Sequence, residues 1–125
     1  MAKILIVDDE INARKLYGAE LGGEGYETVS AATVGDALES FEREKPDLVI
    51  LDIKLGDESG IDALMQIVKQ RKNIPVILNS AYSVYKDNFQ TWAADAYIVK
   101  SVDLAPLKEK IRELLASRSA GGGGS

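Results

Sequence analysis

The chain has 125 residues, of which 46% are hydrophobic, and a formal net charge of -5 at pH 7. This length and hydrophobic content suit one domain that buries an ordinary core, and the excess of acids argues against a nucleic-acid-binding domain. The chain contains no cysteine and no histidine, which excludes disulfides, thiolate or histidine-ligated metal sites and a histidine general base, so any chemistry must use carboxylates, hydroxyls and lysines.

The start of the chain leads directly into a predicted strand. Residues 4–7 are aliphatic and end on Asp8 and Asp9, with no long apolar segment before them. No apolar run in the sequence approaches the roughly 18 residues of a membrane span. We therefore expect a cytoplasmic protein.

A helix, a strand and a second helix follow from the periodicity of the apolar residues. The first helix is expected to bury Ala13, Leu16, Tyr17 and Leu21 on one face. Residues 28–31 alternate in polarity, which is typical of an edge strand. The second helix is predicted to be capped by Thr33 and to end before Pro46.

The most informative stretch is residues 47–52, in which four aliphatic residues end on Asp52. A short apolar run bounded by polar residues predicts a strand buried on both faces. We expect a flexible polar loop over residues 54–60, with Asp57 or Ser59 capping the helix that follows. The inner face of that helix is predicted to carry Ile61, Leu64, Met65 and Val68.

Two further apolar runs predict the last strands: residues 76–78 end on Asn79 and Ser80, and residues 96–99 end on Lys100. Between these runs lies an aromatic stripe with helical spacing. It indicates a core seam or, as an open alternative, a partner surface. The stripe consists of Tyr85, Phe89 and Trp92.

The end of the chain divides into a helix and a tail. Asp103 is the expected cap of an amphipathic helix, and four glycines and a serine close the sequence. We expect one domain over residues 1–117 and a flexible linker or cloning scar over residues 118–125.

Strands that alternate with helices predict an α/β fold, a doubly wound, flavodoxin-like parallel sheet of five strands with helices on both faces. The strand order 2-1-3-4-5 places the alternating strand at an edge and strands one and three at the centre. Because the carboxyl ends of parallel strands meet at one edge of the sheet, we expect the polar residues that end the strands to share one site. These residues are Asp8, Asp9, Asp52, Ser80 and Lys100.

Three neighbouring carboxylates repel one another, and a hard divalent cation with oxygen ligands, most plausibly Mg²⁺, relieves that repulsion. Such a site makes one carboxylate a candidate nucleophile toward phosphorus, which would give an aspartyl phosphate. A lysine can pair with a phosphate oxygen, and a hydroxyl can donate a hydrogen bond to another.

Over residues 3 to about 116 the chain resembles the receiver domains of two-component response regulators, the CheY-like family. The resemblance is carried by the order and spacing of its motifs together, because no single motif is specific. These motifs are Val7-Asp8-Asp9-Glu10, Leu51-Asp52 with Gly60 eight residues later, Ser80-Ala81 and Tyr97-Ile98-Val99-Lys100.

The resemblance implies that Asp52 is the phosphoacceptor. The residues implied to form the acidic pocket and to hold Mg²⁺ are Asp8, Asp9, Asp52 and, through its backbone carbonyl, Lys54. The residues implied to bind the phosphoryl group are Ser80, Ala81 and Lys100, and those implied to switch are Ser80 and Tyr97.

Two positions depart from the family pattern. Receiver domains usually have proline directly after the active-site lysine and four residues after the phosphoacceptor, where this chain has Ser101 and Gly56. Neither proline contacts phosphate, so we expect phosphorylation to survive and the coupling of the two loops to the output to change.

The implied function is a switch in phosphorelay signal transduction rather than an enzyme, with only self-catalysed phosphorylation and dephosphorylation. The implied phosphodonor is a phosphohistidine on a sensor kinase or phosphotransfer protein. The output would be protein association, including a possible homodimer, on the face built from the fourth helix, fifth strand and fifth helix. The chain would be a stand-alone receiver or part of a larger regulator.

Two other classes of function stay open. A pseudo-receiver would never take phosphate and would act as a constitutive docking module. A phosphatase of the haloacid-dehalogenase type also uses an aspartyl nucleophile and Mg²⁺, but it would need a second acid two residues after the nucleophile, where this chain has Lys54.

Overall fold

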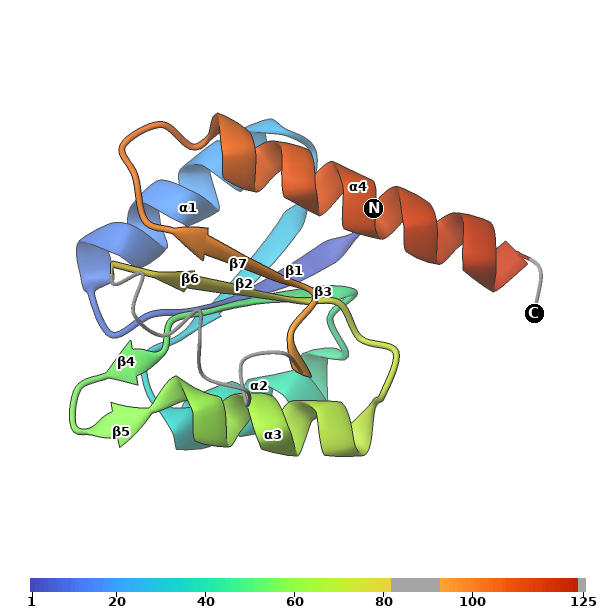
Figure 1. Cartoon of the computed structure of the whole chain (residues 1–125). Helices are drawn as coiled ribbons and strands as arrows, with labels where there is room; N and C mark the ends of the chain where they lie inside the picture. The colour runs from blue at the N-terminus through green and yellow to red at the C-terminus, as the bar shows by residue number, and fades with distance from the viewer. Residues whose placement is uncertain (82–92, 124–125) are drawn as a thin grey trace.

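A computed structural model of the chain describes residues 1–81 and 93–123, with side chains as far as residue 117 (Figure 1). Five parallel strands form one sheet in the order β2-β1-β3-β6-β7, which confirms the predicted fold and strand order. The strands are β1 (Lys3–Val7), β2 (Glu27–Ala31), β3 (Leu48–Leu51), β6 (Val76–Ser80) and β7 (Ala96–Val99).

The central strands are buried on both faces, as their apolar sequences predict. All four residues of β3 are buried, and so are all five residues of β6. In contrast, β2 has exposed and half-buried residues along most of its length, which agrees with its place at the edge of the sheet. The apolar runs thus distinguish β3 and β6 from the edge strand β2, whereas β7 is also apolar but lies at the other edge and is only partly buried.

The helices among the described residues lie on both faces of the sheet (Figure 1). The helices α1 (Ile11–Gly23) and α4 (Ala105–Gly123) lie on one face, where Tyr17, Leu21 and Ile111 belong to the same buried cluster. On the other face lie α2 (Val34–Glu44) and α3 (Gly60–Gln70), whose Phe41 and Leu64 share a second cluster.

The predicted helix caps are confirmed. The Thr33 hydroxyl accepts a hydrogen bond from the backbone N–H of Asp36 at 3.1 Å. Ser59, rather than Asp57, caps α3, since its hydroxyl accepts from the N–H of Ile61 at 3.2 Å. At the start of α4 the Asp103 carboxylate accepts from the N–H of Ala105 at 3.0 Å. Each cap satisfies a donor that the helix itself leaves unpaired.

Two side chains predicted to face the core face solvent instead. Leu16 in α1 is 49% exposed and Met65 in α3 is 42% exposed. Each is the direct chain neighbour of a buried residue, Tyr17 or Leu64. A step of one residue turns a helix by about 100°, which carries Leu16 and Met65 to the margin of the buried stripe.

The loop expected over residues 54–60 is a short antiparallel hairpin of β4 (Lys54–Leu55) and β5 (Glu58–Ser59). Its first turn residue, Gly56, has φ 61, the sign that a type II′ hairpin turn requires at that position. The sequence predicted a flexible polar loop here and missed the two strands, because strands of two residues are too short to show alternation in polarity.

Helix α4 extends to Gly123, beyond the predicted domain boundary at residue 117, and that boundary stays a prediction. The aromatic stripe at residues 85–92 lies outside the described residues. Among the described residues, no helix is both long and apolar enough to cross a membrane.

Candidate phosphoacceptor site

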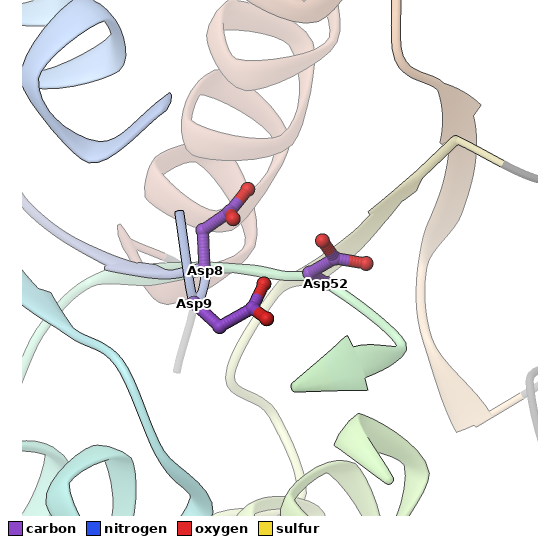
Figure 2. A group of neighbouring side chains, drawn as sticks. All are labelled: Asp8, Asp9 and Asp52. Atoms are coloured by element: carbon purple, nitrogen blue, oxygen red, sulfur yellow. The ribbon is translucent and has the colours of Figure 1, made fainter. Parts of the chain in front are cut away.

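Three aspartates meet at the carboxyl ends of β1 and β3 (Figure 2). Asp8 and Asp9 follow β1, and Asp52 follows β3; β1 and β3 pair in parallel with Val7 beside Leu51. Each aspartate offers a carboxylate oxygen that lies within 4.8 Å of those offered by the other two. The sheet therefore brings together the acids that the sequence predicted to share one pocket.

Lys100 enters the same pocket from the end of β7. Its ammonium lies 2.7 Å from Oδ2 of Asp8 and 2.8 Å from Oδ2 of Asp52. The backbone N–H of Lys100 donates to the carbonyl of Ser80 at 2.7 Å, which holds the end of β7 beside the end of β6. One cation thus bridges two buried carboxylates contributed by different strands.

Burial and ion pairing shift the pKa values of Asp52 and Lys100 with different balances. Burial raises the pKa of Asp52, and the hydrogen bond and charge of Lys100 only partly offset this effect. For Lys100, burial acts to lower the pKa, but the hydrogen bonds to Asp52 and Asp8 prevail and raise it. At neutral pH the ammonium therefore stays charged beside a carboxylate whose ionisation the site disfavours.

Backbone donors orient all three acids. The N–H of Glu10 donates to Asp8 at 3.0 Å, and the N–H of Lys54 donates to Asp52 at 3.2 Å. Asp9 is exposed and accepts from the N–H of Gly56 at 3.0 Å, a contact from the turn of the hairpin. Sequence reasoning did not identify these donors, because a backbone N–H leaves no side-chain signal.

A cavity of about 250 Å³ opens at the acids. It is lined by Asp9, Glu10, Asp52, Lys54, Ala81 and Lys100. The cavity gives a small tetrahedral group access to Asp52. All of its lining residues except Glu10 were predicted as site residues.

The two predicted switch residues lie near cavity-lining residues in the sequence: Ser80 directly precedes Ala81, and Tyr97 belongs to β7, the strand that Lys100 follows. Ser80 is fully buried at the end of β6, next to Ala81. Tyr97 is half-buried in β7 and packs against the core cluster on the α2 and α3 face. Both positions fit the predicted roles, and the roles themselves stay predictions.

Gly60 fits tightly against the backbone of the phosphoacceptor candidate. A Cβ at this position would collide with the carbonyl oxygen of Asp52 and crowd Cα of Ile53. The first residue of α3 must therefore be glycine for the chain to pass this close behind Asp52.

A buried polar pair near the site went unrecognised in the sequence. The side-chain amide of Asn79 donates to the Tyr17 hydroxyl at 2.9 Å, and both residues are buried. Burial raises the pKa of Tyr17, and the charges of Lys100, Asp8 and Asp52 all reach the hydroxyl. The available signal was Asn79 itself, an amide that ends an apolar run and therefore needs a buried partner.

Comparisons with known proteins agree on one family. The model of the response regulator receiver domain matches residues 4–112. The chain is 36% identical over 115 residues to the probable transcriptional regulator ycf27 of Cyanophora paradoxa, covering 90% of this chain and 48% of that protein. It is 33% identical over 119 residues to sporulation initiation phosphotransferase F of Bacillus subtilis, covering 94% and 96%. The chain thus spans about half the length of the first of these relatives and nearly all of the second.

Two solved structures agree with these matches. The response regulator protein TrrA from Thermotoga maritima, crystallised in complex with Mg²⁺-BeF, is 45% identical with a TM-score of 0.88, over 91% of this chain and 99% of that one. TrrA in complex with the histidine kinase ThkA superposes with a TM-score of 0.86, over 92% and 99% of the two chains.

Proposed function

Because this chain belongs to the family of response regulator receiver domains, we propose that it accepts a phosphoryl group on Asp52 and acts as a switch in phosphorelay signalling. The observation that carries the proposal is the shared pocket, in which the Lys100 ammonium contacts both Asp8 and Asp52. The chain spans about half of its first curated relative, so an output domain in the whole protein is part of the proposal.

The pocket fits a divalent cation. Carboxylate oxygens from three aspartates lie within 4.8 Å of one another, and such a set of hard oxygen ligands suits Mg²⁺. The residues that would hold Mg²⁺ are Asp8, Asp9, Asp52 and the backbone carbonyl of Lys54. When bound, the cation offsets the negative charge of the phosphoryl oxygens. The Mg²⁺-BeF complex of TrrA supports the same assignment.

Phosphoryl transfer needs little from the protein beyond position and charge. A carboxylate oxygen of Asp52 attacks the phosphorus of a phosphohistidine, a P–O bond forms as the P–N bond breaks, and the donor imidazole leaves with the electron pair. Lys100 then exchanges its contact with Asp52 for one with a phosphoryl oxygen, and the N–H of Ala81 and the hydroxyl of Ser80 donate to others. Attack by water on the phosphorus reverses the switch.

The donor is a histidine kinase or a histidine phosphotransfer protein. Beside the cavity residues Glu10 and Lys100, the chain exposes two apolar side chains, Ile11 and Val102. Exposed apolar side chains close in sequence to a charged pocket suit a protein donor better than a free phosphate ester, because only a macromolecular partner would bury Ile11 and Val102. The complex of TrrA with a histidine kinase supports this class of donor.

The output is a change of surface. The phosphoryl group adds about -1.5 to -2 charge at neutral pH and draws the Ser80 hydroxyl toward it. Tyr97 in β7 then turns inward, which alters the face that includes β7 and α4 and its association with an output domain or a second copy. A population shift of a few kcal/mol is enough for such a switch.

Intact mass spectrometry after incubation with a small phosphodonor tests the proposal. Wild type is expected to gain one phosphoryl group only when Mg²⁺ is present, and Asp52→Ala to gain none. An unchanged mass for wild type would favour the pseudo-receiver. Steady turnover of a phosphomonoester would favour the phosphatase, although Lys54 stands where that class needs an acid.

A further inference from the structure

The hairpin of β4 and β5 contacts the acidic pocket through one backbone group. Gly56, at the tip of the hairpin, donates its N–H to Oδ2 of Asp9 at 3.0 Å. Glu58, on the second strand, accepts from the N–H of Val34 at 3.1 Å and so ties the hairpin to the start of α2. The hairpin therefore connects Asp9, in the acidic pocket, with the first residue of α2.

Asp9 differs from the other two aspartates in how it is held. Asp8 and Asp52 are buried and each contacts the Lys100 ammonium, whereas Asp9 is exposed. Within residues 1–81 and 93–117, the Asp9 carboxylate accepts one hydrogen bond, that from Gly56. An exposed carboxylate without this bond would sample several rotamers, and only one group of them faces Asp52.

At position 56, where receiver domains usually have proline, this chain has a glycine, which keeps a backbone N–H and can adopt positive φ. Gly56 donates its N–H to Asp9 and has φ 61, a conformation that residues with a Cβ seldom adopt. Proline would lose both the positive φ and the hydrogen bond, since it fixes φ at about -65° and has no N–H to donate.

From these contacts we propose that Gly56 is a positioning residue for the metal site. Its N–H holds one oxygen of Asp9, so that the other oxygen is directed toward Asp8 and Asp52 before the cation arrives. The inference rests on the proposed function, because it concerns how the chain prepares the Mg²⁺ site. Partners that orient a metal ligand commonly contribute tenfold or more to affinity, and for this exposed acid we expect about threefold to tenfold.

Isothermal titration with Mg²⁺ on the full chain tests the proposal. Gly56→Pro removes the donor and is expected to weaken Mg²⁺ binding by about threefold to tenfold. Gly56→Asn keeps the N–H and tolerates positive φ, so it should bind within about twofold of wild type. Glu58→Ala loosens the other end of the hairpin and should also stay within about twofold. Equal binding by Gly56→Pro and wild type would overturn the proposal, and so would an equal loss in Glu58→Ala.

The amide resonance of Gly56 reports whether its hydrogen bond to Asp9 persists when the cation binds. Its downfield shift and slow exchange are expected to persist through the Mg²⁺ titration, with Asp9→Ala marking the position of the released amide. Movement to that released position on binding Mg²⁺ would contradict the positioning role. If wild type binds no Mg²⁺ at all, the proposed function fails together with this inference, whereas binding that ignores Gly56→Pro overturns the inference alone.

Discussion

At the scale of single residues, the phosphoacceptor candidate is held at a cost to stability. Asp52 is buried beside another carboxylate, and burial raises its pKa more than the hydrogen bond and charge of Lys100 lower it. Functional sites commonly keep such groups because the chemistry needs them. We therefore expect substitutions of Asp52 and of Lys100 to have opposite effects on stability.

Asp52→Asn is expected to raise the melting temperature of the metal-free protein by about 4 °C, because it removes a buried charge worth about 1 kcal/mol and leaves Lys100 paired with Asp8. Thermal unfolding followed by circular dichroism measures the difference. A lower melting temperature than wild type would show that the ion pair stabilises the fold.

The same substitution gives a pH dependence of definite sign. Because the folded pKa of Asp52 lies above its ordinary 3.8, the folded state holds the proton more tightly than the unfolded chain. Stability from this group is present at low pH and is lost as the pH rises through the folded pKa. The advantage of Asp52→Asn over wild type should be small below pH 3.8 and should grow above it. A constant difference across this range would contradict the assignment.

Lys100→Ala is expected to destabilise the metal-free protein by about 3 kcal/mol, because it leaves two buried carboxylates without their shared cation. Added Mg²⁺ should recover part of the loss, since it supplies positive charge to the same acids. Urea denaturation with and without Mg²⁺ measures both effects. Lys110→Ala is the control, because the Lys110 ammonium pairs with Glu113 on the surface. An equal loss in this variant would argue against the role of Lys100.

At the scale of elements, the sequence predicted the strands and helices that have a periodic or continuous apolar pattern. It missed features that depend on single contacts. The central strands were predictable because β3 is aliphatic throughout and ends on Asp52. The hairpin was not, because two-residue strands carry no pattern and the positive φ of Gly56 is visible only in coordinates. Leu16 was misplaced because helical periodicity defines a stripe but not its margins.

Gly60→Ala tests the close passage of α3 behind the phosphoacceptor. The added methyl would strike the carbonyl of Asp52, so the backbone must move at a cost of about 2 kcal/mol and phosphorylation should slow. Gly35→Ala is the matched control in α2, where an added Cβ meets nothing within 4 Å. This substitution should raise the free energy of unfolding by about 0.5 kcal/mol. Equal melting temperatures for the two variants would refute the packing argument.

The buried bond between α1 and β6 is suited to a double-mutant cycle. Tyr17→Phe leaves the Asn79 amide buried without a partner and should cost about 1–2 kcal/mol. The same change in an Asn79→Leu background should cost much less, since no donor is stranded there. Urea unfolding of the four proteins gives the coupling energy, and additive losses would mean that the bond contributes nothing.

At the scale of the whole molecule, the fold brings together groups that are far apart in the sequence. Lys100 and Asp52 are 48 positions apart and meet at 2.8 Å because four neighbouring parallel strands end at the same edge. That convergence was predictable from strand order alone. The contacts of Lys100 with two carboxylates and the backbone donors to the acids were not predictable, because they depend on atomic positions that strand order does not define.

The most direct test of the account identifies which residue carries the phosphoryl group. After phosphorylation with a small phosphodonor and Mg²⁺, borohydride reduces an aspartyl phosphate to homoserine, and peptide mass spectrometry locates the change. We expect homoserine at residue 52 alone, in a peptide that the Asp52→Ala variant does not yield. Modification at Asp8, Asp9 or Asp57, or none in wild type, would contradict the account.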